Sequence, residues 1–406
     1  MINGMQERET LRVKNLFKEK FSYTPTHLVK APGRLELLGN HTDYNQGLVM
    51  SLAVDKYIFI ASSPRSDGYV ELVSSAFPER EKFSISELKK NPAAPWADYV
   101  KGVLAELRKA GVHFGGFDAA IHGTVPMGAG MSSSAALEVA TALTMRQLYP
   151  YTVTEAGSTV PPKRDEKGEL RSLRLDEKLN LARLCQRAEN QYVGVQSGIL
   201  DQVSSLFGKE FHALEIDCQQ LSVDHVPMIG DIAIFICNSG VKHSLVGGEY
   251  NELRVMCESA AKKIGVKALR AVDSKMLADN KSKLTEREYQ CAYHIVGEIQ
   301  RVIFGARALR EDDFAQFGQY MFQSHESSRD FFGNSTKELD LLVEIARQHP
   351  AILGARLTGG GFGGATINLI KRDGIEDFSK YMSAEYKRRS DHEMTPLFCQ
   401  IVDGAS

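Results

Sequence analysis

A glycine-rich loop that runs directly into a helix is the feature that most constrains the fold of this chain. In GTVPMGAGMSSSAALEVATAL, residues 123–143, Gly128 and Gly130 precede three serines and an alanine-rich stretch. The start of a helix offers unpaired backbone N–H groups and the positive end of the helix dipole, and both favour a phosphate group. Serine is also a favoured N-cap residue, so a plain capped helix explains the same spacing.

The three serines add hydroxyl groups to this loop. The hydroxyls of Ser132, Ser133 and Ser134 can donate to phosphate oxygens or ligate a magnesium ion. No Gly-Lys-Ser/Thr follows the glycines, so the loop is not a Walker A motif. A phosphate site and a serine-capped helix therefore remain the two alternatives.

Chain length and charge limit the class of protein. At 406 residues the chain exceeds the usual size of one core, so we expect two packed domains. A formal net charge of -2 gives no reason to expect nucleic acid or an anionic membrane as a partner.

The start of the chain lacks the apolar core of a signal peptide, and no apolar run reaches the roughly 20 residues of a membrane helix. Six scattered cysteines without a CxxC pair indicate reduced thiols and a cytoplasmic location.

Apolar periodicity predicts helices and strands in both halves of the chain. A new strand that opens at residue 231, followed by long helical stretches, supports a boundary near residue 228 and thus two α+β domains, 1–228 and 229–406. Residues 152–172 are charged, contain Gly and Pro, and lack a period, so we expect an exposed insertion or flexible loop there. Helices are expected over 10–20, 96–110, 132–148, 176–192, 198–207, 246–265 and 284–309, and extended chain over 48–63 and from residue 231.

Two carboxylates stand out against the apolar pattern. Glu189 falls on the apolar stripe of the expected helix 176–192, where a carboxylate is rarely buried without a cation or metal. A magnesium ligand and a structural ion pair are equally good explanations. Asp201 lies beside Ser204 and Ser205, so its periodicity favours an exposed polar face, although the nearby Gly198 permits close backbone approach to a ligand.

Five of the six residues from 359 to 364 are glycines, and they lead into an expected strand. Such a run costs chain entropy, which is easiest to explain if the backbone packs tightly against something else. A second loop beside the phosphate and a tight contact between domains are both consistent with it.

The segment LLGNHTDYNQG, residues 37–47, concentrates an amide, an imidazole, a carboxylate and a phenol between Asn40 and Tyr44. It fits a ligand site, and it also fits a polar turn in which Asp43 caps residues 45–47.

Six fragments in order resemble the galactokinase family, within the GHMP small-molecule kinases, from about residue 27 to the C-terminus. The resemblance implies an N-terminal domain like the second domain of ribosomal protein S5 and a C-terminal ferredoxin-like domain, with the active site between them. The fragments are APGRLELLGNHTDYNQG, VPMGAGMSSSAALE, CQRAENQYVGVQSGILDQ, NSGVKHSLVGGEYN, SHESSRDFF and LTGGGFGGATINL.

The resemblance implies the catalytic roles. Asp201 matches the aspartate that accepts the proton of the anomeric hydroxyl as its oxygen attacks the γ-phosphorus, which outweighs the exposed-face interpretation. Arg34 matches the arginine that keeps this aspartate ionised and stabilises charge on the transferring phosphoryl group. Ser134 and Glu189 match ligands of Mg²⁺, the expected cofactor.

The same resemblance implies the two binding sites. ATP is expected beside the aromatic residues of PWADYVKG and against the phosphate loop, and the sugar beside the polar residues of LLGNHTDYNQG. The expected ATP-binding residues are Trp96, Tyr99, Gly128, Ala129, Gly130, Ser132, Ser133 and Ser134. The expected sugar-binding residues are Asn40, His41, Asp43, Gly198 and Tyr250. We expect Asp43 to select the axial 4-hydroxyl, because an epimer would leave a buried acceptor unpaired.

Two positions depart from the family pattern. Galactokinases usually carry a glutamate, which accepts from the sugar's 6-hydroxyl, where this chain has Asn40. Asparagine is shorter, neutral, and both donor and acceptor, so it suits a water-mediated contact or a substrate with a different carbon 6. Glu36 stands where the family commonly has asparagine, a change that we treat as minor at this level.

The expected activity is ATP-dependent phosphorylation of galactose at the anomeric hydroxyl by a monomer. A kinase for N-acetylgalactosamine or a 6-modified galactose is the first alternative. A galactokinase-like sugar sensor without catalysis is the second, but sensors of that kind lose part of a serine-alanine stretch that is intact here at residues 132–136.

Overall fold

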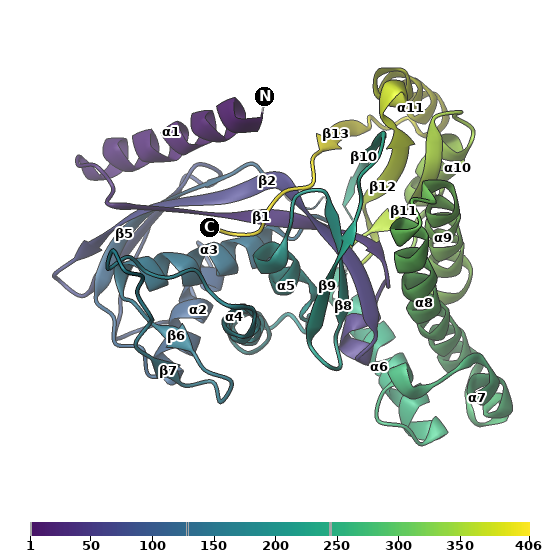
Figure 1. The fold of residues 1–406 in the computed structure, drawn as a ribbon, viewed down its shortest axis with the longest axis horizontal. Helices are drawn as coiled ribbons and strands as arrows, with labels where there is room; N and C mark the ends of the chain where they lie inside the picture. Colours follow the sequence, from purple (N-terminus) through teal and green to yellow (C-terminus); the bar gives the residue numbers. More distant parts are fainter. Residues whose placement is uncertain (1, 127, 129, 243–245) are drawn as a thin grey trace.

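The computed structural model describes residues 2–126, 128, 130–242 and 246–406. Its first half is built on a sheet with the strand order β4-β3-β5-β2-β8-β9, to which β1 adds through β2 (Figure 1). The strands are β1 (His27–Leu38), β2 (Leu48–Arg65), β3 (Tyr69–Ser74), β4 (Glu81–Ser84), β5 (Gly116–Gly123), β8 (His212–Asp217) and β9 (Ser222–Pro227).

Strand β2 is apolar on both faces, so each face of the sheet packs against its own layer of helices. Its alternate residues Tyr57 and Phe59 pack against helix α1, Ile2–Phe21, whereas Ile58 and Ile60 join the main core. Figure 1 shows α1 on one side of the sheet and the remaining helices of this half on the other. Those helices are α2 (Ala97–Lys109), α3 (Ser133–Leu148), α4 (Leu175–Arg187) and α5 (Leu200–Phe207).

The second half is built on a sheet with the order β11-β12-β10-β13, where β10 is Ile232–Lys242, β11 Ile352–Thr358, β12 Gly363–Lys371 and β13 Thr395–Cys399. Alternation along β10 again fills two layers. Phe235 packs with helices α10 and α11, while Ile234 and Ile236 join the core shared with the first half. The helices are α6 (Val246–Ile264), α7 (Ser274–Asp279), α8 (Glu286–Arg310), α9 (Phe314–Ser327), α10 (Lys337–Arg347) and α11 (Ile375–Ser390).

This mixed architecture of helices and sheets in both halves agrees with the expected α+β class. The expected boundary at 228/229 falls between β9 and β10 and stays a prediction. The last residues of the chain return to the first half, because Ser406 and Lys30 exchange backbone hydrogen bonds of 2.8 and 3.0 Å. In the part of the chain described, no helix is both long enough and apolar enough to cross a membrane.

Three local expectations were wrong in detail. The helix expected over 176–192 is α-helical only to Arg187, and a π-helix, Ala188–Val193, follows it. Apolar periodicity does not reveal this widened turn, in which the N–H of Gly194 donates to the carbonyl of Glu189. The segment 152–172 is not irregular throughout, because β6 (Thr152–Val153) and β7 (Thr159–Val160) form a short hairpin. Helix α1 also begins earlier than expected.

Candidate active site

A cavity of about 430 Å³ is lined by residues of β1, the 39–47 loop, the start of α3, α5 and the glycine run. A slightly larger cavity, about 470 Å³, lies beside the 152–172 segment and α4. We place the candidate site in the smaller one because its walls hold the chemically suited groups. Its polar wall residues are Arg34, Glu36, Asn40, His41, Asp43, Ser132, Ser134, Glu189, Gln196, Ser197, Asp201, Tyr250 and Asn251.

The Asp201 carboxylate is held between two donors. Arg34 Nε donates to Oδ1 at 2.7 Å, and the Ser132 hydroxyl donates to Oδ2 at 2.5 Å. Arg34 is buried, whereas a fifth of the Asp201 side chain is exposed to the cavity. Each carboxylate oxygen can accept more than one hydrogen bond, so the group can still receive a proton from a ligand hydroxyl. The structure therefore does not show the freely exposed polar face that periodicity favours for Asp201.

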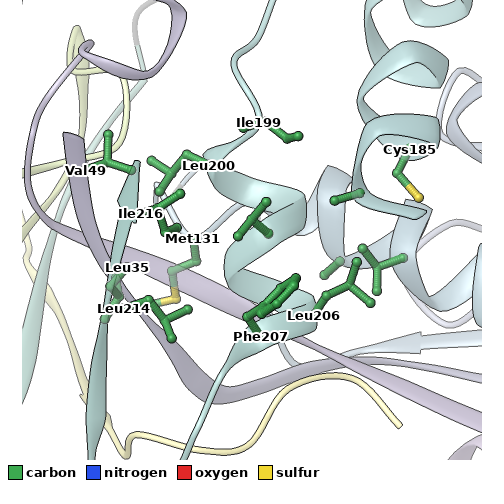
Figure 2. Close-up of a cluster of buried hydrophobic side chains, with 14 of the residues drawn as sticks. Leu35, Val49, Met131, Cys185, Ile199, Leu200, Leu206, Phe207, Leu214 and Ile216 are labelled. Carbon is green, nitrogen blue, oxygen red and sulfur yellow. The ribbon is translucent and has the colours of Figure 1, made fainter. Parts of the chain in front are cut away.

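Helix α5 carries Asp201 and is seated on a hydrophobic core. Figure 2 shows Leu200, Leu206 and Phe207 of this helix beside Leu35 of β1 and Leu214 of β8. Leu200 directly precedes Asp201, so the packing that buries one side of the helix orients the carboxylate on the other. The apolar pattern of α5 thus fixes where the polar group points.

The phosphate loop begins helix α3 without a serine cap. Ser132 has a left-handed conformation with φ of 52°, and its side chain makes no capping hydrogen bond because it is directed to Asp201. The first-turn N–H groups of α3 consequently do not receive the serine cap that the sequence allowed. Ser133 and Ser134 occupy that first turn and are partly exposed. Ala129 lies outside the described residues.

The glycine run 359–364 packs against this loop. A Cβ built on Gly130 would lie 2.7 Å from the carbonyl oxygen of Thr358, and one on Gly364 would lie 3.2 Å from the carbonyl oxygen of Gly128. Gly130 has φ of +68°, a conformation that side chains rarely adopt. The run therefore forms a tight contact between the two halves at the phosphate loop.

Glu189 is a buried carboxylate without a cationic partner among the described residues. It accepts hydrogen bonds from Ser197 Oγ at 2.5 Å and Gln202 Nε2 at 3.1 Å. Burial raises its pKa, and hydrogen bonds from Ser197 and Ser134 oppose that rise. Because the ion-pair alternative is not seen, Glu189 and Ser134 fit a hard cation that keeps water and phosphate as its other ligands.

Asp43 and Gly198 form one wall together. The Asp43 Oδ1 accepts from the N–H of Tyr44 at 2.8 Å, so it does not cap residues 45–47. A Cβ at Gly198 would lie 1.7 Å from Asp43 Oδ2, which means that only glycine leaves room for this carboxylate. Burial, together with nearby Asp201, raises the pKa of Asp43 to about 7.

His41 is a neutral imidazole held on both nitrogens. Burial lowers its pKa to about 4. Its Nε2 donates to the carbonyl of Gly360 at 3.0 Å, so Nδ1 is the acceptor for the Tyr44 hydroxyl at 2.8 Å. The Tyr250 ring stacks obliquely 4.8 Å from the imidazole and also lines the cavity.

Asn40 is fully buried and hydrogen-bonded within the protein. Its Nδ2 donates to Glu36 Oε1 at 3.1 Å and to the carbonyl of Gly359 at 2.8 Å, and its Oδ1 accepts from Asn334 Nδ2 at 2.8 Å. The backbone N–H groups of Gly39 and Asn40 both donate to Glu298 of α8, at 2.9 and 2.8 Å.

The expected adenine residues are not among the residues that line this cavity. Trp96 is buried, and its ring lies parallel to that of Phe77 with centroids 5.7 Å apart. Its Nε1 has no hydrogen-bond partner among the described residues. Tyr99 is partly buried one turn later, at the start of α2, and burial raises its pKa to about 12.

Sequence reasoning missed the residues that support this site. Glu298, Arg356 and Asn334 come from the second half and carry no motif, so only their burial and contacts identify them. Tyr44 and Ser132 were named in motifs, but their bonds to His41 and Asp201 depend on the tertiary fold.

Sequence and structure comparisons identify the relatives of this site. The galactokinase galactose-binding signature matches residues 15–64, and the GHMP kinase N-terminal and C-terminal domains match 98–161 and 306–388. A galactokinase from Roseiflexus sp. (strain RS-1) is 36% identical over 401 residues, covering 98% of this chain and 96% of the relative. The Bos taurus galactokinase is 38% identical over 402 residues, covering 97% and 95%.

This chain belongs to the galactokinase family. It is therefore a sugar kinase of the GHMP fold, as its ordered motifs predicted. The crystal structure of Lactococcus lactis galactokinase complexed with galactose is similar with a TM-score of 0.87 and 30% identity, covering 97% of this chain and 98% of that chain. The galactokinase signature, residues 15–64, covers β1 and the 39–47 loop that supply Arg34, His41 and Asp43.

Proposed function

We propose that this chain transfers the γ-phosphoryl group of ATP to the anomeric hydroxyl of galactose. The observation that carries the proposal is the Arg34–Asp201–Ser132 arrangement in one cavity with Asp43 and the start of α3. A base, a cationic group and a helix N-terminus are the parts that phosphoryl transfer to a hydroxyl requires. The relatives named galactokinase support galactose as the acceptor.

Asp201 accepts the proton of the anomeric hydroxyl as that oxygen attacks the γ-phosphorus. Arg34 neutralises charge that develops on the transferring phosphoryl group and orients the carboxylate through Oδ1. The Ser132 hydroxyl holds Oδ2, so the base keeps one orientation while the substrate enters. The N–H groups at the start of α3 bind the phosphates of ATP.

The ATP and metal sites are part of the same proposal. Ser134 and Glu189 would hold Mg²⁺, which when bound offsets the negative charge of the ATP phosphates. Trp96 and Tyr99 would contact the adenine, and Ser133, Gly128 and Gly130 its phosphates. Asp43, His41, Gly198 and Tyr250 would surround the sugar, with Asp43 reading the 4-hydroxyl.

The test is an ATP-consumption assay over galactose, glucose, N-acetylgalactosamine, 6-deoxygalactose and galacturonate, with the phosphate position read by NMR. We expect galactose 1-phosphate as the preferred product and a galactose preference over glucose. Equal specificity constants for the two epimers would contradict the role of Asp43.

The catalytic assignment has its own variant. We expect Asp201→Ala to lower kcat by at least roughly 10²-fold, because a positioned base contributes about that much. Asp224→Ala is the matched control, since Asp224 is exposed on β9. Near-normal turnover by a folded Asp201→Ala protein would overturn the assignment.

A further inference from the structure

Glu36 and Asn40 carry two residue types in exchanged order relative to the family pattern, which has asparagine at the first position and glutamate at the second. The structure places the two side chains in contact, with Asn40 Nδ2 donating to Glu36 Oε1 at 3.1 Å. The exchange therefore keeps one carboxylate and one amide at the same place in the molecule. The two departures from the family pattern are therefore coupled through this side-chain contact, although they lie four residues apart in the sequence.

The Asn40 amide has no donor left for a ligand. A side-chain amide has two N–H groups, and those of Asn40 go to Glu36 and to the carbonyl of Gly359. Its oxygen accepts from Asn334 at 2.8 Å. The side chain is fully buried, so Asn40 holds neighbouring groups in place instead of presenting an amide to the sugar.

The Glu36 carboxylate, by contrast, has one free oxygen on the cavity wall. Its Oε1 accepts from Asn40 and faces Arg356 Nη1 at 3.5 Å. Its Oε2 accepts no hydrogen bond from any described residue and is not fully enclosed. A buried carboxylate oxygen left open to a cavity is an acceptor that a ligand hydroxyl can satisfy.

Two arginines favour the charged form of this carboxylate, whereas its burial opposes that form. Arg356 is fully buried behind it, and its Nε and Nη2 have no hydrogen-bond partner among the described residues. Burial raises the pKa of Glu36, and Arg356 and Arg34 oppose that rise. An ionised acceptor forms a stronger hydrogen bond with a hydroxyl than a neutral amide oxygen does.

The strand register sets the distance between Glu36 and the reacting centre. Arg34 and Glu36 pair with Ala53 and Ser51 without an intervening bulge, so their side chains leave the same face of β1 about 7 Å apart. Arg34 lies at the end of the cavity where phosphoryl transfer is proposed, because it donates to Asp201. A sugar bound with its anomeric hydroxyl at Asp201 would therefore present to Glu36 a part remote from the anomeric carbon.

We propose that Glu36 is a specificity-determining residue that accepts a hydrogen bond from the 6-hydroxyl of the sugar through Oε2, and that Asn40 is a positioning residue for this carboxylate. The inference rests on the proposed function for the identity of the sugar. With Glu36 in this role, asparagine at position 40 does not require a substrate that is modified at carbon 6, and the preferred sugar carries an ordinary 6-hydroxyl.

The first test measures sugar binding, which does not depend on turnover. Isothermal titration calorimetry compares galactose with 6-deoxygalactose on the wild-type chain, on Glu36→Gln, and on Glu210→Gln as an exposed control. We expect Glu36→Gln to weaken galactose binding about 10-fold or more, because a charged hydrogen bond is lost, and to change 6-deoxygalactose binding little. An unchanged ratio of the two affinities in Glu36→Gln would overturn the inference.

The second test restores the family order. Glu36→Asn leaves Arg356 without its carboxylate, and Asn40→Glu places two carboxylates in contact, so each single variant should bind galactose at least about 10-fold more weakly. The double variant again pairs one carboxylate with one amide and should recover most of this loss. A double variant that loses the product of the two single effects would contradict the coupling.

These outcomes are separable from those of the proposed function. A wild-type chain that binds galactose more tightly than 6-deoxygalactose but transfers no phosphate to it would contradict the kinase activity and support the role of Glu36. A wild-type chain that phosphorylates galactose with no preference over 6-deoxygalactose would contradict the role of Glu36 alone.

Discussion

Asp43 illustrates how one residue links pH to sugar recognition. Its carboxylate fills the space that a side chain at Gly198 would need, and its pKa lies near 7 mainly because the group is buried. Protonation below that pH converts one of its oxygens into a donor and removes an acceptor for sugar hydroxyls. His41 does not change its charge in the same pH range, because burial lowers its pKa to about 4.

We therefore predict that kcat/KM for galactose falls as the pH drops through about 7, since this ratio reports the free enzyme. Asp43→Asn should be weakly active at every pH and should lack this limb of the profile. The measurement is kcat/KM for galactose between about pH 5.5 and 8.5.

The same shift has a consequence for stability with a defined sign. A carboxyl with a raised folded-state pKa contributes stability while protonated, and this contribution is lost as the pH rises through about 7. Asp43→Asn should therefore gain in Tm over the wild-type chain at pH values above that range. A flat activity profile in the wild-type chain would contradict the assignment to Asp43.

At the scale of elements, the contact between the phosphate loop and the glycine run aligns α3 with the second half. Gly130 has a positive φ and touches Thr358, and its carbonyl accepts from Arg34 Nη1. The loop is thus tied both to Arg34 and to the end of β11.

We predict that Gly130→Ala raises the KM for ATP and costs about 1–3 kcal/mol of stability, because a Cβ there is strained and meets Thr358. Gly111→Ala is the matched control, since Gly111 also has a positive φ but no atom nearer than 3.8 Å to a built Cβ. It should lose stability without changing the KM for ATP. Equal ATP kinetics in both variants would exclude a role for the loop contact.

The observed helices and strands also show which elements can be predicted from local sequence. Helix α3, which is rich in alanine and other helix formers, and strand β2, which is rich in β-branched and aromatic residues, lie close to their expected ranges. The π-helix after α4 was missed because both kinds of helix repeat their apolar residues at similar spacing. That single widened turn is where Glu189 lies, at the wall of the cavity.

At the scale of the whole molecule, a buried polar network joins the two halves. Glu298 of α8 receives the backbone N–H groups of Gly39 and Asn40, and it pairs with Arg301 at 2.5 Å. Burial raises its pKa, but Arg301 and His294 lower it below the ordinary value of a glutamate. One side chain of the second half thus holds the 39–47 loop of the first.

We predict that Glu298→Ala lowers the free energy of unfolding by about 3 kcal/mol or more, because it leaves buried donors and a cation unpaired. Gln300→Ala, an exposed change on the same helix, should have little effect. Urea denaturation followed by circular dichroism measures both. A loss as small as that of the control would mean that the network does not hold the halves together.

The sequence by itself determined the family, the fold class and the approximate position of seven helices and of the long strands β2 and β10. These follow from local patterns, because glycines, cap residues and apolar periods act over a few residues. It also placed Asp201, Arg34 and Asp43 in one hypothesis through the ordered motifs.

Only the tertiary structure decided which polar atoms are already paired within the protein. Arg34 and Asp201 are 167 residues apart, and Asn40 and Glu298 are 258 apart, so no local pattern links them. Whether Asn40 or Glu36 presents a free oxygen depends on Gly359, Asn334 and Arg356, which fold beside them from the far end of the chain. Hydrogen-bond satisfaction is a property of three-dimensional contact, and this is why it could not be deduced from sequence spacing.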